Sequence, residues 1–240
     1  MGQSAPRAGL PGRLFAWLGG AFFAASLLYF LYAYFVRFGR PGAGAGGDPV
    51  APLAFNTALF TVFALHHSVL ARSGAKRLVE RQLGPALERA SYVWLSSALF
   101  LACCLWWREV PGVVYSLPAA LHPLGWLVQA AGIALTLEAA RRLDVLDLAG
   151  VRQAIGGRGS ARLHADGLYG VVRHPIYLAW TLLVFGAPHM TATRFSFACV
   201  STIYLMVAIP LEERSLVREF GREYVAYQRL VRWRMIPGLY

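Results

Sequence analysis

The stretch "LFAWLGGAFFAASLLYFLYAYFV" (residues 14–36) carries no charged side chain. A helix that crosses the hydrocarbon core of a bilayer needs about 20 predominantly apolar residues, so this run is long enough to span a membrane. It is longer than the apolar part of a cleavable secretion signal, and it lacks a convincing cleavage site. We therefore expect it to be retained as the first transmembrane helix.

Five further apolar runs predict further helices along the chain. They lie at residues 52–71, 91–107, 117–138, 176–189 and 195–211. The run at 176–189 is short and has Pro188 near its end, so we expect it to form a tight helical hairpin with the next run. With 57% hydrophobic and 15% charged residues, the 240-residue chain is predicted to be all-α, a polytopic membrane helix bundle of five to six transmembrane helices.

Basic residues are divided unequally between alternate connections. Four of the 23 Lys and Arg residues lie on one expected side of the membrane: Arg37, Arg40, Arg108 and Arg194. The other 19 lie before the first run, in the two connections that follow the second and fourth runs, and after residue 211. Because cytoplasmic connections accumulate Lys and Arg, both termini are predicted to be cytoplasmic, in a membrane that we expect to be the bacterial inner membrane. Basic residues spread between apolar runs also argue against a nucleic-acid partner.

The segment after residue 211 predicts an amphipathic helix. Leu216, Phe220, Tyr224 and Tyr227 recur there at helical spacing, while arginines fall on another face. Such a helix lies on the membrane surface or packs against the bundle.

We expect the chain to be organised in two parts of one integrated domain. Residues 1–138 would form the N-terminal transmembrane helices. Residues 139–240 would form the C-terminal core, with a cytoplasmic connection, the helical hairpin and the amphipathic helix.

The run Arg173-His174-Pro175 stands directly before an apolar helix. Proline disfavours helical backbone at the preceding residue, so His174 is expected to be extended where the helix begins. Free amides at a helix start favour an anion, and Arg173 is suited to bind the same group through two hydrogen bonds. The alternative is an ordinary interfacial helix start with an arginine that reaches toward water.

Glu212 and Glu213 follow the last apolar run. Two carboxylates at the end of an apolar helix are costly unless a cation, a proton or an arginine meets them. Pro210 would loosen the helix and aim both inward; alternatively, they are simply the first polar residues in water. Since residues 173–175 and 212–213 flank one hairpin on the same side, we expect them to be neighbours and to suit a zwitterionic or cationic ligand.

Two strings resemble a known signature. "GLYGVVRHPIYLAW" (167–180) and "EERSLVREFGREYVAY" (212–227) resemble the C-terminal signature of the isoprenylcysteine carboxyl methyltransferase and phospholipid N-methyltransferase superfamily. Its members are integral-membrane enzymes that use S-adenosylmethionine. Ala179 replaces a residue that is usually glycine in that signature. The end "VRWRMIP" does not align with the usual ending, so no role is assigned to Arg232 or Arg234.

The resemblance implies S-adenosylmethionine as the methyl donor. It implies these cofactor-binding residues: Arg173, His174, Pro175, Tyr177, Glu212, Glu213, Tyr224 and Tyr227. The donor's carboxylate would meet Arg173 or the helix start, and its sulfonium and ammonium would meet Glu212 or Glu213. Its adenine would pack against Tyr224 or Tyr227.

A second resemblance concerns the acceptor. "NTALFTVFALHHSVLARS" (56–73) and "ERASYVWLSS" (88–97) resemble bacterial methanethiol S-methyltransferases and their NnrU-like relatives, although His66 stands where those commonly have glutamine. Adjacent helical residues point about 100° apart, so at most one of His66 and His67 readily faces a given site. The resemblance implies a small thiol acceptor, for which a neutral His67 would act as the catalytic base. A packing or interfacial role for these histidines is the alternative.

The sequence is also compatible with other functions. The acceptor is alternatively a prenylcysteine carboxylate or a phospholipid amine, and the chain is alternatively a non-enzymatic, NnrU-like accessory or transport protein. A metal-handling protein would use His66, His67 and His122. We expect no metal site, because the cysteines lie in apolar runs without ligand spacing. Membrane lipids are expected partners, and the oligomeric state is open.

Overall fold

The computed structural model describes residues 7–40, 47–70, 73–157 and 162–240. Its helices confirm the all-α membrane bundle, and the protein is an integral membrane protein. Five helical stretches are long and apolar enough to cross a bilayer: Leu10–Arg37, Val50–Ser68, Glu88–Trp106, Ala119–Arg141 and Ala192–Phe220. A sixth apolar helix, Pro175–Phe185, is shorter.

The chain divides into two compact units. The first holds the described residues of Met1–Phe38, Val50–Arg108 and Leu143–Ser160, and the second holds those of Gly39–Pro49, Glu109–Arg142 and Ala161–Tyr240. The predicted division at residue 138 stays a prediction.

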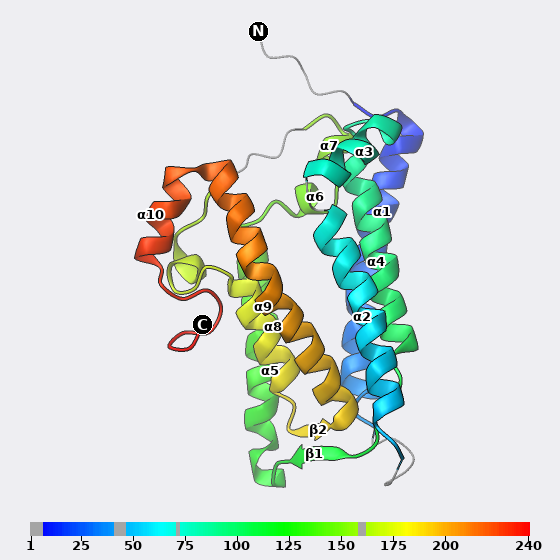
Figure 1. Ribbon diagram of the computed structural model, residues 1–240, viewed down its shortest axis with the longest axis vertical. Coiled ribbons are helices and arrows are strands. Elements are labelled where there is room, and N and C mark those ends of the chain that lie inside the picture. The colour runs from blue at the N-terminus through cyan, green and yellow to red at the C-terminus, as the bar shows by residue number, and fades with distance from the viewer. Residues whose placement is uncertain (1–6, 41–46, 71–72, 158–161) are drawn as a thin grey trace. The chain divides into compact units, whose positions relative to one another are not determined.

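The first unit contains three of the long helices and three short ones (Figure 1). Its elements are α1 (Leu10–Tyr32) with a π-helical end (Ala33–Arg37), α2 (Val50–Leu70), α3 (Ser73–Leu83), α4 (Glu88–Trp106), α6 (Val145–Leu148) and α7 (Val151–Ala154). Helices α1 and α4 pack closely at Gly19, where an added Cβ would lie 2.8 Å from the Trp94 ring. The Trp94 indole also donates to the carbonyl of Phe15 at 2.9 Å. A glycine therefore makes room for the tryptophan that joins the two helices.

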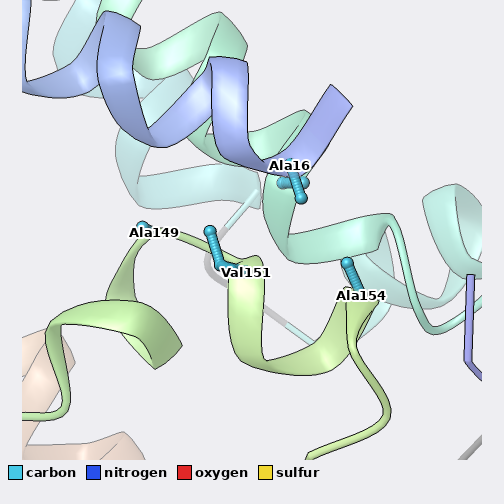
Figure 2. Close-up of a cluster of buried hydrophobic side chains, with 5 residues drawn as sticks. Ala16, Ala149, Val151 and Ala154 are labelled. Atoms are coloured by element: carbon cyan, nitrogen blue, oxygen red, sulfur yellow. The ribbon is translucent and has the colours of Figure 1, made fainter. Parts of the chain in front are cut away.

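Small side chains pack the short helices against the ends of α1 and α4. Figure 2 shows Ala16 of α1 beside Ala149, Val151 and Ala154, which belong to the buried cluster that Ala90 of α4 completes. Consequently Ala149, Val151 and Ala154 of the 139–175 connection are part of the core of this unit.

Polar side chains satisfy exposed backbone groups near the end of α4. Asn56 is fully buried, donates to the carbonyl of Arg108 at 2.8 Å and accepts from its amide at 2.8 Å. Arg37 donates to the carbonyls of Cys104 and Leu105 at 2.9 and 3.2 Å. The last carbonyls of a helix have no partner within that helix, so these contacts supply what α4 itself lacks.

The second unit holds two long helices, two shorter helices and a small sheet (Figure 1). Its elements are β1 (Val113–Ser116), a 3-10 turn (Ala119–Leu121), α5 (His122–Arg141), a second 3-10 turn (Gly167–Gly170), α8 (Pro175–Phe185), β2 (His189–Thr191), α9 (Ala192–Phe220) and α10 (Arg222–Leu230). Strands β1 and β2 are antiparallel and pair Val113 with Thr191 and Ser116 with His189. Sequence reasoning missed this sheet because its strands are too short to show an alternating pattern.

Helix α9 is longer than the apolar run that predicts it. It continues past Pro210 to Phe220 and ends at Gly221, whose φ is +57°. Glycine adopts this left-handed backbone without the penalty that a Cβ brings. The predicted amphipathic helix is therefore divided between the last turns of α9 and the separate helix α10.

Helices α5 and α8 approach each other at small residues. A Cβ added to Gly132 would lie 2.7 Å from both the carbonyl oxygen of Ala179 and the amide nitrogen of Leu183. Ala179 is fully buried, and the Gln129 amide donates to the carbonyl of Leu183 at 3.0 Å. Small residues let membrane helices pack backbone against backbone, so alanine at 179 still permits the close approach.

We expect Gly132→Leu to destabilise the protein, because the new side chain would collide with the backbone of α8. Overpacking of this kind costs about 1–3 kcal/mol. Thermal unfolding in detergent would show a lower midpoint than for Ala134→Leu, which enlarges an exposed position of the same helix. Equal midpoints for the two variants would contradict the close contact.

Candidate functional site

The second unit contains a buried ion pair between Arg173 and Glu213. The Arg173 Nε donates to Glu213 Oε1 at 2.6 Å, and the two side chains are only 7% and 5% exposed. The Arg173 Nη1 donates to the carbonyls of Val231 and Arg232 at 2.7 and 3.0 Å. One guanidinium thus joins the segment before α8, the α9 helix and the segment after α10.

The backbone next to Arg173 forms the same connection. His174 precedes α8 with φ −124° and ψ 68°, outside the helical region that proline disfavours at the preceding residue, although this ψ is smaller than that of the extended backbone expected there. Its amide and that of Arg173 therefore lie outside the helix, and they donate to the carbonyls of Arg234 and Trp233 at 2.8 and 2.9 Å. These two amides and two nitrogens of the guanidinium consequently donate their hydrogen bonds to groups of the protein itself.

His174 lies between the two adjacent glutamates. Its Nε2 is 3.4 Å from Glu213 Oε1, and its Nδ1 is 3.7 Å from Glu212 Oε2. The ring stacks on Tyr177 with centroids 5.3 Å apart and planes 8° apart. The Tyr177 hydroxyl donates to Glu212 Oε2 at 2.7 Å. The first turn of α8 therefore reaches both carboxylates.

The expected proximity of residues 173–175 to residues 212–213 is confirmed, but the two glutamates differ in environment. The Glu213 side chain is 5% exposed, whereas that of Glu212 is 43% exposed. Glu213 is enclosed by cationic side chains. Glu212 is half-open to the surroundings and keeps a carboxylate accessible to a ligand.

Arg234 is a further member of this site that sequence reasoning missed. Its Nε is 3.3 Å from Glu213 Oε2, and the Gln228 amide donates to the same oxygen at 3.3 Å. The sequence showed only an arginine close to the end of the chain. Its position depends on the pairing of residues 233–234 with residues 173–174, which no local pattern reveals.

Tyr224 and Tyr227 lie in the core of the unit, 1% and 4% exposed. The Tyr227 hydroxyl donates to the carbonyl of Tyr169 at 2.7 Å. The Tyr224 hydroxyl is buried without a hydrogen-bond partner among the described residues. Burial raises the pKa of both hydroxyls, so they stay protonated at neutral pH. Both rings are covered by neighbouring side chains, and their contact with adenine stays a prediction.

An open cavity of about 460 Å³ lies beside Glu213. This volume falls within the range of about 300–1,000 Å³ that is usual for small-molecule and cofactor sites. Its lining residues are Pro210, Glu213, Arg214, Val217, Arg218, Gln228 and Arg234.

The first unit holds the two adjacent histidines. His67 Nδ1 lies 2.8 Å from the hydroxyl of Tyr92, so α4 orients the ring of a residue in α2. The His66 ring stacks on the same tyrosine at 6.0 Å, and both its nitrogens are buried without a hydrogen-bond partner in the described part of the chain. The two strings with the second resemblance are thus in contact. A catalytic role for His67 stays a prediction.

The described residues contain no group of three or more His, Cys, Asp or Glu side chains placed to bind a metal ion. His122, the third histidine of the metal-handling alternative, lies in the second unit, where its Nε2 is 3.0 Å from the carbonyl oxygen of Leu117. That contact gives the ring a backbone partner.

Curated relatives match most of the chain. It is 36% identical over 232 residues to methanethiol S-methyltransferase of Mycobacterium tuberculosis, covering 87% of this chain and 91% of the relative. It is 34% identical over 242 residues to methanethiol S-methyltransferase 2 of Bradyrhizobium diazoefficiens, covering 95% and 90%. Nurim of Xenopus laevis is more distant, at 26% identity over 235 residues, covering 79% and 80%. No protein-family model and no solved structure matches the chain.

The different burial of the two glutamates predicts different effects on stability. Glu213→Gln should leave Arg173 buried without its carboxylate, which costs about 3–5 kcal/mol. Glu212→Gln should cost less than about 1 kcal/mol, because that side chain is half exposed. Thermal unfolding of both variants in one detergent would measure the difference. A Glu212→Gln variant as unstable as Glu213→Gln would show that this assignment is wrong.

Proposed function

The chain belongs to the family of methanethiol S-methyltransferases, and we propose that it transfers a methyl group from S-adenosylmethionine to methanethiol or a similarly small thiol. The observation that carries this proposal is the identity of 34–36% with two enzymes of that name, over 87–95% of the chain. Such coverage includes the histidine segment of the first unit and the charged site of the second.

The site of the second unit fits a methyl donor of this chemistry. S-adenosylmethionine supplies an electrophilic methyl group bound to a positively charged sulfur, beside an amino group and a carboxylate. The half-exposed Glu212 offers a carboxylate for a cationic group, and Tyr177 fixes the direction of one of its oxygens. A positively charged ligand is attracted by such a group when water is excluded.

In this proposal the remaining predicted residues hold the two glutamates in place. Arg173 and His174 hold Glu213, and Pro175 sets the start of α8 so that Tyr177 reaches Glu212. A methyl transfer needs its two reactants held in line more than it needs covalent chemistry from the protein. The contacts of these side chains with the two glutamates suit that task.

The acceptor thiol must lose its proton before or during transfer, because the thiolate is the nucleophile. We propose that His67 accepts this proton through a ring nitrogen, while Tyr92 holds the ring. Phe63, whose ring centroid lies 5.6 Å from that of His67, places an apolar surface next to the base. An apolar neighbour suits a small thiol whose only other group is a methyl.

We further propose that the protein lies in the bacterial inner membrane with both termini in the cytoplasm. The support is the excess of Lys and Arg in alternate connections. In this orientation the charged site at the end of α9 faces the compartment in which S-adenosylmethionine is made. The β1–β2 sheet faces the outer side.

The activity is tested with detergent-purified protein, methanethiol and S-adenosylmethionine labelled in its methyl group. We expect labelled dimethyl sulfide in the headspace. His67→Ala should lower the rate by about 100-fold, because general-base catalysis contributes about 10²–10⁴-fold. Binding of the donor should be unchanged in that variant, which serves as the control for folding.

Two results would contradict this function. The first is transfer to a prenylcysteine or to phosphatidylethanolamine with none to methanethiol. The second is donor binding without transfer to any thiol. A His67→Ala variant with full activity would remove only the proposed base.

The orientation is tested by labelling with a maleimide that does not cross membranes. Sheet β1–β2 and α10 lie at opposite ends of the second unit (Figure 1). In whole cells Val114→Cys on β1 should react, whereas Ala226→Cys on α10 should react only after permeabilisation. Cys199→Ser is included in both, because Cys199 is partly exposed. The reverse pattern would invert the topology.

A further inference from the structure

The cavity beside Glu213 carries an excess of positive charge. Three of its lining residues are arginines, Arg214, Arg218 and Arg234, and Glu213 is the one acidic residue in the lining. That carboxylate is already paired with Arg173, and its Oε1 lies 3.4 Å from His174 Nε2. The positive charge of the three arginines therefore exceeds the negative charge of the lining.

Two of these arginines have no acidic partner among the described residues. Arg214 and Arg218 are exposed and one turn apart on α9, so they project from the same side of the helix. Arg218 donates to the hydroxyl of Ser215 at 2.8 Å. Two guanidinium groups on one wall of a cavity favour a carboxylate or a phosphate, which guanidinium binds through paired hydrogen bonds.

The two carboxylate oxygens of Glu213 have different partners. Oε1 receives the short 2.6 Å hydrogen bond of Arg173. Oε2 has only longer contacts, both of 3.3 Å, to Arg234 and Gln228 of the cavity wall. Since Oε2 retains capacity to accept a stronger hydrogen bond, the cavity combines arginines for an anion with one carboxylate oxygen for a cation.

We propose that this cavity binds the amino-acid end of the methyl donor. Arg214, Arg218 and Arg234 would bind its α-carboxylate, and Glu213 Oε2 would accept from its α-ammonium. The inference rests on the proposed function. It assigns the carboxylate to the cavity arginines and not to Arg173, because Arg173 is only 7% exposed and does not line the cavity, and its Nε and Nη1 are used by Glu213 and two backbone carbonyls.

A zwitterion fits this lining better than a lipid phosphate does. The phosphodiester of an anionic lipid such as phosphatidylglycerol would use the arginines but has no cation for Glu213. An amino-acid group carries both charges on one carbon, which matches a lining that combines Glu213 with arginines. The neutral Gln228 completes the wall without adding charge.

The test compares two ligands that differ by one group. S-adenosylmethionine and its decarboxylated analogue are titrated by calorimetry into the full-length protein in detergent. Wild-type protein should bind S-adenosylmethionine about 10- to 100-fold more tightly, as expected for charge-assisted hydrogen bonds to one carboxylate. In Arg214→Gln/Arg218→Gln the difference should fall to about threefold or less, with the affinity for the analogue unchanged.

Two variants serve as controls. Arg229→Gln removes an exposed arginine of α10 outside the cavity lining and should keep the wild-type preference. Arg234→Gln should reduce the preference in the same way as the double variant. Because Arg234 also contacts Glu213, thermal unfolding of the Arg234→Gln variant is measured together with its affinity for the two ligands.

The outcomes separate this inference from the proposed function. If the wild-type protein binds neither ligand, S-adenosylmethionine is not the donor. If the wild-type protein binds both ligands equally, or if the double variant loses affinity for both equally, S-adenosylmethionine remains the proposed donor but the arginines do not bind its carboxylate. Arginine-dependent stabilisation by phosphatidylglycerol, with equal affinity for the two ligands, would assign the cavity to a lipid headgroup.

Discussion

The buried pair of Glu213 and Arg173 is the constraint on which the second unit depends. A carboxylate so deeply buried is tolerated only when cationic groups and hydrogen-bond donors surround it. Arg173, Arg234 and Gln228 provide those groups, and they come from the segment before α8, from α10 and from the segment after α10. To satisfy one carboxylate, the start of α8, the end of α9 and the segment after α10 must lie together.

The packing of α5 against α8 fixes the position of the helix that follows Arg173. Gly132 lets the two backbones approach, and Gln129 bonds to a carbonyl of α8, so the helix whose first turn carries Tyr177 is fixed along its length. Sheet β1–β2 ties the opposite end of the same unit, where Tyr115 donates to the carbonyl of Ala187 at 3.0 Å. A site that aligns two reactants gains from such rigid support, because small misplacements slow the transfer strongly.

Each unit supplies a different part of the proposed chemistry. The first unit orients a histidine through Tyr92 in apolar surroundings, which suits proton removal from a small thiol. The second unit arranges carboxylates and guanidinium groups, which suit a donor with positive and negative charges. The protein itself need form no covalent bond with either reactant.

The sequence by itself determined the membrane bundle, the helix start at Pro175 and the proximity of Arg173 to the glutamates. Hydropathy over 20 residues and the effect of proline on its neighbour are local properties, so they can be read along the chain. Only the tertiary structure decided that Glu213 is enclosed while Glu212 stays half open, and that Arg234 joins them. These outcomes depend on which side of α9 meets α8 and on the pairing of residues 173–174 with 233–234, contacts between residues about 60 positions apart that no local pattern specifies.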